Sequence, residues 1–137
     1  MELRTLDSCE AAAALLAAQR LPIDDLSDPT ILLVGAFEND VLVGVIGLQT
    51  CDEVALLRSL AVDPAHRDRG IAAALCERVF VLAGDRDLYL LTESADGYFT
   101  RLGFEAIDRS IVPAAIRSTA QFSVLCSSSS RVMRKTH

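Results

Sequence analysis

The chain has 137 residues, about half of them apolar, and its 13 lysine and arginine side chains stand against 19 acidic ones, for a formal net charge of −6. This length fits a single domain, and the acidic balance disfavours general binding to nucleic acid, which needs a basic face. No apolar stretch reaches the roughly 18 to 20 residues of a membrane span and no signal peptide is evident, so we expect a cytoplasmic protein without a membrane partner.

Cysteine and histidine usage argues against a metal site. The four cysteines are scattered without a C-x-x-C pair, and the chain has only two histidines. Zinc sites in proteins draw on clustered thiolates and imidazoles. We therefore expect no metal and reduced thiols, and we interpret Cys126, which lies in an apolar run, as core packing.

The first half of the chain predicts a helix and a run of antiparallel strands. Residues 2–6 alternate like a short strand, and Asp7 with Glu10 resembles a capping box that starts an alanine-rich helix ending near residue 20. Strands are then predicted over 31–38, 41–49 and 53–62. Asn39 and Asp40 suit a tight hairpin between the first two of these strands.

Glycines in the second of these strands predict an irregularity. Gly44 and Gly47 both lie within the predicted strand 41–49. Glycine inside a strand marks a bulge or a close backbone approach. We expect one or the other at this point.

The second half predicts a crossover between parallel strands. Ile71, Leu75, Val79 and Leu82 share one helical face, and Gly84 follows as a cap. A strand, this helix and the apolar run 87–92 form a right-handed crossover, which makes the two strands parallel neighbours with a ligand site at their carboxyl ends. The remaining predicted elements are a helix over 95–102, a strand over 104–108, a helical turn after 113, and a strand over 131–135.

A basic loop lies at the predicted ligand end of the crossover. A helix start leaves unpaired N–H groups and partial positive charge, which together favour an anion. Gly70 allows a ligand to approach the backbone, and Arg67 and Arg69 add positive charge. The alternative is an ordinary glycine turn with solvated arginines, since short motifs of this kind often arise by chance.

Two motifs resemble the GNAT superfamily of acetyl-CoA-dependent N-acetyltransferases. The first is Leu60-Ala61-Val62-Asp63-Pro64 followed by Arg67-x-x-Gly70-x-Ala72, and the second is Tyr98-Phe99-Thr100-Arg101-Leu102-Gly103-Phe104. The resemblance covers nearly the whole chain. It implies an α/β (α+β) fold: a single GNAT-like domain over 1–137, with a mixed central sheet of six to seven strands, flanking helices, and a splayed parallel strand pair that holds acyl-CoA.

A narrower resemblance concerns the acceptor. Stretches 55–62, 88–92, 107–109 and 113–117 are similar to bacterial arsenic-resistance N-acetyltransferases, a group linked to acetylation of arsinothricin, a glutamate analogue. This implies a small-molecule amine acceptor. A protein N-terminal acetyltransferase and a non-catalytic CoA-binding module remain open alternatives. GNAT relatives are often dimers, which makes a homodimer possible, with strand 131–135 as an exchange element.

The resemblance also implies the residues that hold acetyl-CoA. Backbone groups of Leu60, Ala61 and Val62 would pair with the pantetheine arm, although any buried strand could carry these side chains. The pyrophosphate would be held by backbone amides of the loop and helix start. These belong to Arg67, Asp68, Arg69, Gly70, Ile71 and Ala72.

Transfer of an acetyl group to an amine needs a neutral amine, charge relief at the developing oxyanion, and a proton for the thiolate. A backbone N–H near Ala61 or Val62 would serve the oxyanion. In many GNAT enzymes a tyrosine four residues before the glycine of this second motif protonates the thiolate. Counted back from Gly103, this position is Phe99 in the present chain. The adjacent Tyr98 is our candidate; alternatively it packs the short helix and water protonates the thiolate.

Two further residues are candidates on the acceptor side. Glu93 follows strand 87–92, where it would accept a proton from the amine through water, or else be a solvated carboxylate at a helix start. Arg58 lies on a strand expected to be central, where a buried arginine needs an anion. We predict that it binds the acceptor's carboxylate as a bidentate pair, or that it forms a structural ion pair with an acidic neighbour such as Glu53.

Overall fold

A computed structural model of the chain describes residues 1–125 and 130–137. Its centre is a seven-stranded sheet in the order β1-β2-β3-β4-β5-β7-β6. The single mixed sheet with flanking helices confirms the predicted fold class. Cys126 lies outside the described residues. The strands are β1 (Glu2–Thr5), β2 (Ile31–Glu38), β3 (Val41–Cys51), β4 (Val54–Val62), β5 (Asp87–Thr92), β6 (Glu105–Ile107) and β7 (Arg131–Lys135), and the helices are α1 (Glu10–Ala18), α2 (Ile71–Ala83), α3 (Asp96–Arg101) and α4 (Ala114–Arg117).

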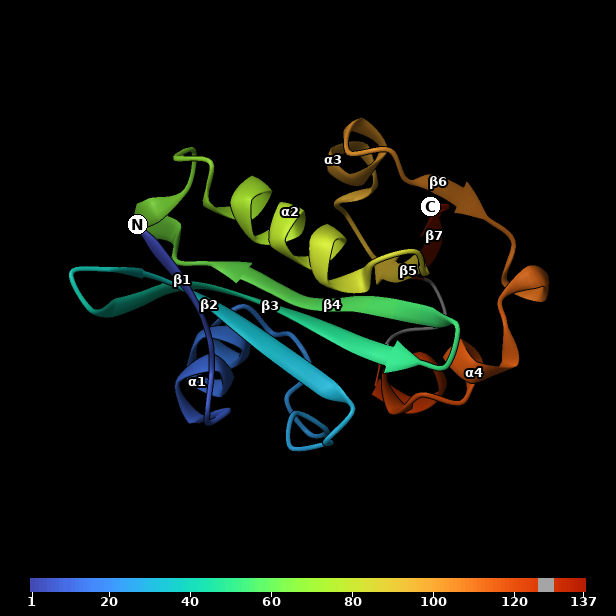
Figure 1. The fold of residues 1–137 in the computed structure, drawn as a ribbon, viewed down its shortest axis with the longest axis horizontal. Helices are drawn as coiled ribbons and strands as arrows, with labels where there is room; N and C mark the ends of the chain where they lie inside the picture. Colours follow the sequence, from blue (N-terminus) through green and yellow to red (C-terminus); the bar gives the residue numbers. More distant parts are fainter. Residues whose placement is uncertain (126–129) are drawn as a thin grey trace.

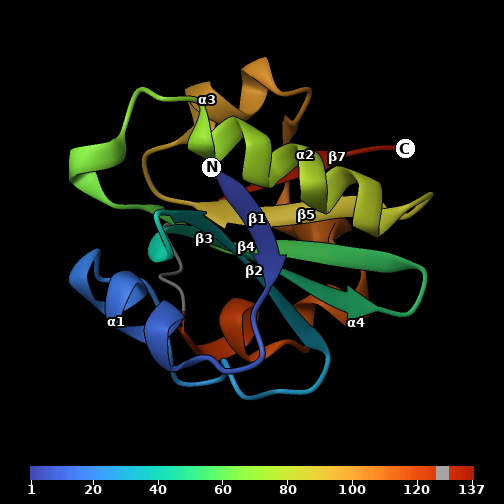
Figure 2. The ribbon, with the colours of Figure 1, turned by 60° about the vertical axis from the view of Figure 1, so that its left-hand side comes forward.

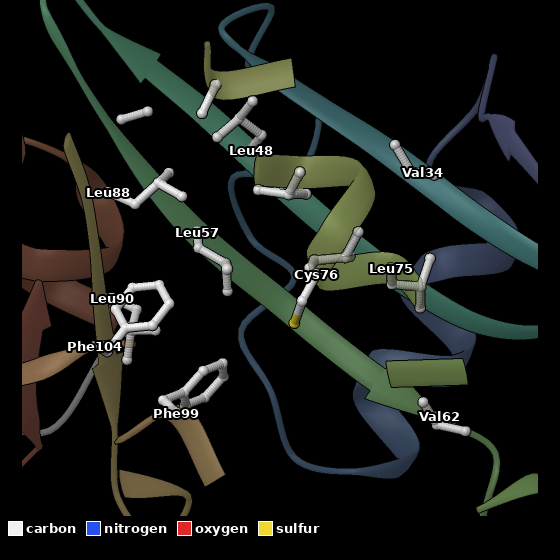
Figure 3. Close-up of a cluster of buried hydrophobic side chains, with 14 of the residues drawn as sticks. Val34, Leu48, Leu57, Val62, Leu75, Cys76, Leu88, Leu90, Phe99 and Phe104 are labelled. Atoms are coloured by element: carbon white, nitrogen blue, oxygen red, sulfur yellow. The ribbon is translucent and has the colours of Figure 1, made fainter. Parts of the chain in front are cut away.

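The helices cover both faces of the sheet. Figures 1 and 2 show α2 and α3 on one face, with α1 and α4 on the other. The largest buried cluster lies between α2 and the sheet, and it includes Leu57 and Leu90 of the strands with Leu75 and Cys76 of the helix (Figure 3). On the opposite face the apolar residues form two separate clusters, one under α1 and one under α4. This separation leaves room between them for polar side chains of β4.

In the antiparallel half of the sheet the hairpin agrees with the prediction from sequence, but the start of the first helix does not. Asn39 and Asp40 have φ of 50° and 62°, as a tight hairpin between β2 and β3 requires. The predicted capping box at Asp7 is wrong, because α1 begins at Glu10, whose backbone N–H is bonded by the Ser8 hydroxyl at 3.2 Å. The N-cap position is Cys9, whose side chain makes no capping hydrogen bond, and Ser8 lies one residue before it.

A bulge interrupts the ladder between β3 and β4. Val45 pairs with Ala61 and Gly47 with Arg58, so Ser59 and Leu60 lie opposite one residue of β3. The extra residue of this bulge is on β4. The bulge predicted for the glycine-bearing strand lies in the other ladder of β3, where Val43, next to Gly44, is the extra residue opposite Ala36 and Phe37 of β2. Ser59 has a φ of 59°, which is rare for a residue other than glycine. The expected close approach at Gly47 is confirmed, since a Cβ there would lie 3.1 Å from Cγ of Arg58.

The parallel pair of strands is short. β4 and β5 are paired only at Val54–Asp87, Ala55–Leu88 and Leu56–Tyr89. Beyond these pairs the strands diverge, and Figure 3 shows the divergence from Leu57 and Leu88 onward. The predicted crossover and its splayed strands are therefore confirmed.

The far edge of the sheet has an order that the sequence does not indicate. β7 lies between β5 and β6 and is antiparallel to both. The strand predicted over 131–135 is confirmed, but it is an interior strand. Exchange of this strand between two chains would therefore break both of its ladders.

Candidate functional site

The divergence of β4 and β5 opens a cavity of about 750 Å³. Its walls come from both faces of the sheet and from the loops that follow α1 and β5. Its polar, charged and aromatic lining includes Gln19, Arg20, Arg58, Arg67, Glu93, Tyr98, Phe99 and Gln121, together with the apolar Leu60. The cavity is therefore lined by both predicted catalytic residues, by the predicted acceptor-binding Arg58, and by Leu60 and Arg67 of the predicted donor-binding set.

The end of β4 turns unpaired backbone groups toward this cavity. Asp63 N donates to Val43 O at 2.8 Å, so Asp63 forms a hydrogen-bonded pair with β3. Backbone direction alternates along an antiparallel ladder, which means that Ala61 also bonds to β3 while Leu60 and Val62 face the gap. The prediction that Ala61 offers its backbone to a ligand is therefore wrong, because β3 already occupies it. Leu60 and Val62 keep that role as a prediction.

One of these groups already has a partner. The side-chain Nε2 of Gln19, at the end of α1, donates to Val62 O at 2.7 Å. A carbonyl oxygen can accept two hydrogen bonds, so Val62 O can still accept a second one from a ligand. The N–H of Val62 also points into the gap. Gln19 thus ties the end of α1 to the edge of the cavity, a contact that the sequence did not indicate.

The loop before α2 has the geometry of an anion site. Gly70 caps the helix with a φ of 76°, and no side chain bonds to the first turn. The first backbone bond of the helix runs from Ala74 N to Gly70 O, so within the described residues the amides of 71–73 have no acceptor. A Cβ at Gly70 would meet nothing within 4 Å, which shows open space beside these amides.

The two arginines of this loop differ. Arg67 lines the cavity and has no ion-pair partner among the residues described. Arg69 is largely exposed, and its Nη1 lies 3.4 Å from Oε2 of Glu38. Asp68 has a φ of 64°, which bends the backbone between them. An anion bound at the start of α2 would therefore find Arg67 free and Arg69 shared with Glu38.

Tyr98 and Phe99 both line the cavity. Phe99 is buried and packs edge-on against Phe104, with ring centroids 5.6 Å apart. The hydroxyl of Tyr98 is buried and has no hydrogen-bond partner among the described residues. A buried hydroxyl without a partner is costly, so this atom marks a place where a ligand atom fits. Burial also raises the pKa of Tyr98 above its ordinary value, which keeps the phenol protonated at neutral pH.

Glu93 lies at the rim of the same cavity. It is exposed and precedes α3, which begins at Asp96. The chain between them is held by the Thr92 hydroxyl, which accepts from Ala95 N at 2.9 Å. The structure thus brings Glu93 and Tyr98 to one cavity, and the role of Glu93 as a base stays a prediction.

Arg58 is engaged by a partner that the sequence did not identify. Its side chain has no exposed surface, and Nη2 and Nη1 donate to the two carboxylate oxygens of Asp25 at 2.5 and 2.7 Å. Nη1 also donates to Gln49 at 3.1 Å. The ion-pair alternative is therefore confirmed in kind, with Asp25 in place of Glu53. A carboxylate from an acceptor would have to displace Asp25 to form the same bidentate pair.

This network ties the loop between α1 and β2 to the sheet. Asp25 lies in the loop, and Gln49 Nε2 donates in turn to the hydroxyl of Thr30 at 3.2 Å. The same loop carries Arg20, Leu21 and Pro22, which line the cavity. Asp25 was missed because nothing local to it indicates a partner 33 residues away.

The comparisons with known proteins agree with this geometry. The model of the acetyltransferase (GNAT) family matches residues 2–104, well over half of the chain. The chain belongs to this family. It is accordingly an acyltransferase, and the resemblance of its two motifs to the GNAT superfamily is confirmed. No curated protein sequence matches the chain.

Solved structures share the GNAT fold at low identity. N-acetylglutamate synthase from Neisseria gonorrhoeae, complexed with coenzyme A and N-acetyl-glutamate, has a TM-score of 0.78 and 18% identity; the alignment covers 98% of this chain but only 34% of that one, so the chain spans about a third of its length. Rv2747 from Mycobacterium tuberculosis, in complex with CoA and NLQ, has a TM-score of 0.79 and 21% identity over 100% of this chain and 99% of that chain. A GNAT-family acetyltransferase from Staphylococcus aureus has a TM-score of 0.76 and 19% identity over 98% of each chain.

Two further features of this GNAT domain concern ions and membranes. Within residues 1–125 and 130–137, histidine, cysteine and acidic side chains form no group of three or more that is placed to hold a metal. None of the helices in the described part of the chain is long and apolar enough to cross a bilayer.

Proposed function

We propose that this GNAT domain transfers the acetyl group of acetyl-CoA to the amine of a small amino-acid-like acceptor. The observation that carries the proposal is the shared cavity, where the free backbone edge of β4 and the unpartnered hydroxyl of Tyr98 face the same space. The open amides at the start of α2, which would bind the donor's phosphates, follow closely on Arg67, which lines that space. Solved structures with the same fold contain coenzyme A, which supports this donor.

Each residue then has a chemical task. Acetyl-CoA supplies an activated acyl group as a thioester. The N–H of Val62 faces the gap and would donate to the oxyanion that develops on the thioester carbonyl. Tyr98 would give its proton to the thiolate, and Glu93 would accept a proton from the acceptor's ammonium through water. The residues hold donor and acceptor on opposite sides of one gap, so positioning contributes as well.

The arginines of the loop give a matched pair of variants. We expect Arg67→Ala to raise the Kd for acetyl-CoA about 10-fold, the loss of one charge-assisted hydrogen bond to a phosphate. Arg69→Ala should raise it less, because Glu38 already shares that guanidinium. Calorimetric titration of both variants tests this order. Equal Kd values for the wild type and Arg67→Ala would show that the loop does not bind the donor's phosphates.

The acceptor is tested by a panel of amines. Arg20 lines the exposed rim of the cavity and has no ion-pair partner among the described residues, so we propose it as the anchor for one carboxylate. The resemblance to arsenic-resistance enzymes adds arsinothricin as the finer candidate. Thiol release from acetyl-CoA should be measured with arsinothricin, phosphinothricin, glutamate, glutamine, asparagine and aspartate. Release above the hydrolysis background with at least one of them is expected, and silence across the panel would refute the proposed acceptor class.

A further inference from the structure

A buried glutamine without a hydrogen-bond partner among the described residues lines the cavity. Gln121 is only 6% exposed, and no hydrogen bond to its side chain is found among the residues described. It begins a π-helical turn, Gln121–Leu125, that follows α4. The turn is held by Thr119, whose backbone oxygen accepts from Ser123 N at 3.0 Å and whose hydroxyl accepts from Phe122 N at 3.3 Å. Turns of this kind are rare and are frequent at functional sites.

Gln49 shows how a structural glutamine behaves in the same protein. It is equally buried, at 5% exposed, and both ends of its amide are bonded: Oε1 accepts from Arg58 and Nε2 donates to Thr30. Burying an amide without such partners is unfavourable. Gln121 has no such partner among the described residues, but its amide is not fully buried, so it stays accessible from the cavity to a bound molecule.

The charges around the cavity limit what that molecule carries. Three arginines line it, but Arg58 is neutralised by Asp25, and Arg67 lies on the loop before α2. Arg20 at the rim remains as the cation for one carboxylate. Arg109 does not line the cavity; it donates to Ser130 O at 2.8 Å and packs on the Phe122 ring. Among the lining residues no further arginine is left to balance a second carboxylate beside Gln121, and a buried carboxylate without a counter-charge is strongly unfavourable. An uncharged amide suits an uncharged partner, since it both donates and accepts.

From these observations we infer that Gln121 binds an uncharged hydrogen-bonding group on the acceptor's side chain, a carboxamide or a hydroxyl. This inference rests on the proposed function and narrows it: the acceptor carries one carboxylate and its side chain is neutral, which excludes arsinothricin and phosphinothricin because their side chains are acids. Gln121 is then the residue that separates glutamine-like from glutamate-like amines. It does so by leaving its own amide unpaired when the wrong acceptor binds.

The test compares matched acceptors that differ only in this group. kcat/KM should be measured for the pairs glutamine with glutamate and asparagine with aspartate, in the wild type and in Gln121→Met and Gln121→Glu. We expect the wild type to favour the amide member of at least one pair about 10-fold or more. Gln121→Met should remove this preference by raising KM for the amide, with KM for acetyl-CoA unchanged. Gln121→Glu keeps the size of the side chain if methionine destabilises the fold, and it should reject the carboxylate members further.

Gln49→Leu is the control for a purely structural effect. It removes a buried glutamine that does not line the cavity, so it should lower stability and leave the ratio of kcat/KM between amide and carboxylate acceptors unchanged. A wild-type enzyme that prefers glutamate or aspartate, or Gln121 variants that keep the wild-type ratio, would overturn the inference while leaving the proposed function intact. Absence of turnover with every panel amine would instead overturn the proposed function, and the inference with it.

Discussion

Asp25→Ala should lower the free energy of unfolding by about 3 to 5 kcal/mol, the cost of leaving a buried charge without its partner. The guanidinium of Arg58 has no exposed surface, and Asp25 accepts from both of its terminal nitrogens. Removal of this carboxylate leaves Gln49 and Ser59 as neutral acceptors, which cannot balance the charge. Urea unfolding followed by circular dichroism gives the change directly, with an unchanged m-value showing that compactness is preserved.

Asp24→Ala is the matched control, because Asp24 is the exposed neighbour in the same loop. Its effect should lie within about 0.5 kcal/mol of zero. The double variant Asp25→Leu with Arg58→Met should recover most of the loss, since apolar replacements remove both charges together. If Asp25→Ala and Asp24→Ala cost the same, Arg58 would not depend on Asp25, and the role of acceptor anchor would be open to it again.

Tyr98→Phe should lower kcat about 100-fold, a typical loss for a general acid, while the KM for acetyl-CoA stays close to the wild-type value. The variant removes only the buried hydroxyl that has no partner among the described residues. Burial raises the pKa of Tyr98, so its acid form persists above the ordinary phenol pKa of about 10. The wild-type kcat should therefore begin to fall only above that pH, and the variant should lack this alkaline limb.

Tyr89→Phe controls for the loss of a tyrosine hydroxyl elsewhere. Tyr89 is buried in the cluster under α4, where it raises the pKa of Arg134, and it does not line the cavity. Its kcat should match the wild type. A second variant, Tyr98→Phe with Phe99→Tyr, moves the hydroxyl to the position that many GNAT enzymes use. If Tyr98→Phe alone keeps kcat within about threefold, water protonates the thiolate and Tyr98 is a packing residue.

Local sequence signals predicted the elements but not their long-range partners. Asn39 and Asp40 fix a hairpin through their own backbone preferences, and Gly84 ends α2 with a φ of 64°, so both were readable from adjacent residues. The motif around Gly70 was readable for the same reason. The partner of Arg58 was not, because Asp25 lies in a loop whose path depends on how α1 packs. Such a contact exists only after the fold has formed.

The backbone of β4 is a second example of a feature that the sequence did not predict, here at the level of single residues. The motif located the strand correctly, but the bulge at Ser59 decides which residues face β3 and which face the cavity. An extra residue on one strand shifts the alternating direction of the backbone N–H and C=O groups beyond it. The backbone groups of Ala61 therefore face β3, while those of Val62 face the gap between β4 and β5. No residue type in the strand predicts the bulge that causes this shift. Gln121 was missed similarly, since only the tertiary structure shows that it is buried beside a cavity.

The short parallel ladder between β4 and β5 divides the sheet into two parts, with a gap, called the seam here, where these two strands diverge. Strands β1 to β4 form one part of the sheet and β5, β7 and β6 form the other, and each part is held together by antiparallel ladders. A donor that hydrogen-bonds to Leu60 and Val62 would become part of the seam while it is bound. Binding to the folded chain alone raises the free energy of unfolding as ligand concentration rises. The concentration of acetyl-CoA would then affect the stability of the folded protein as well as its rate of acetyl transfer.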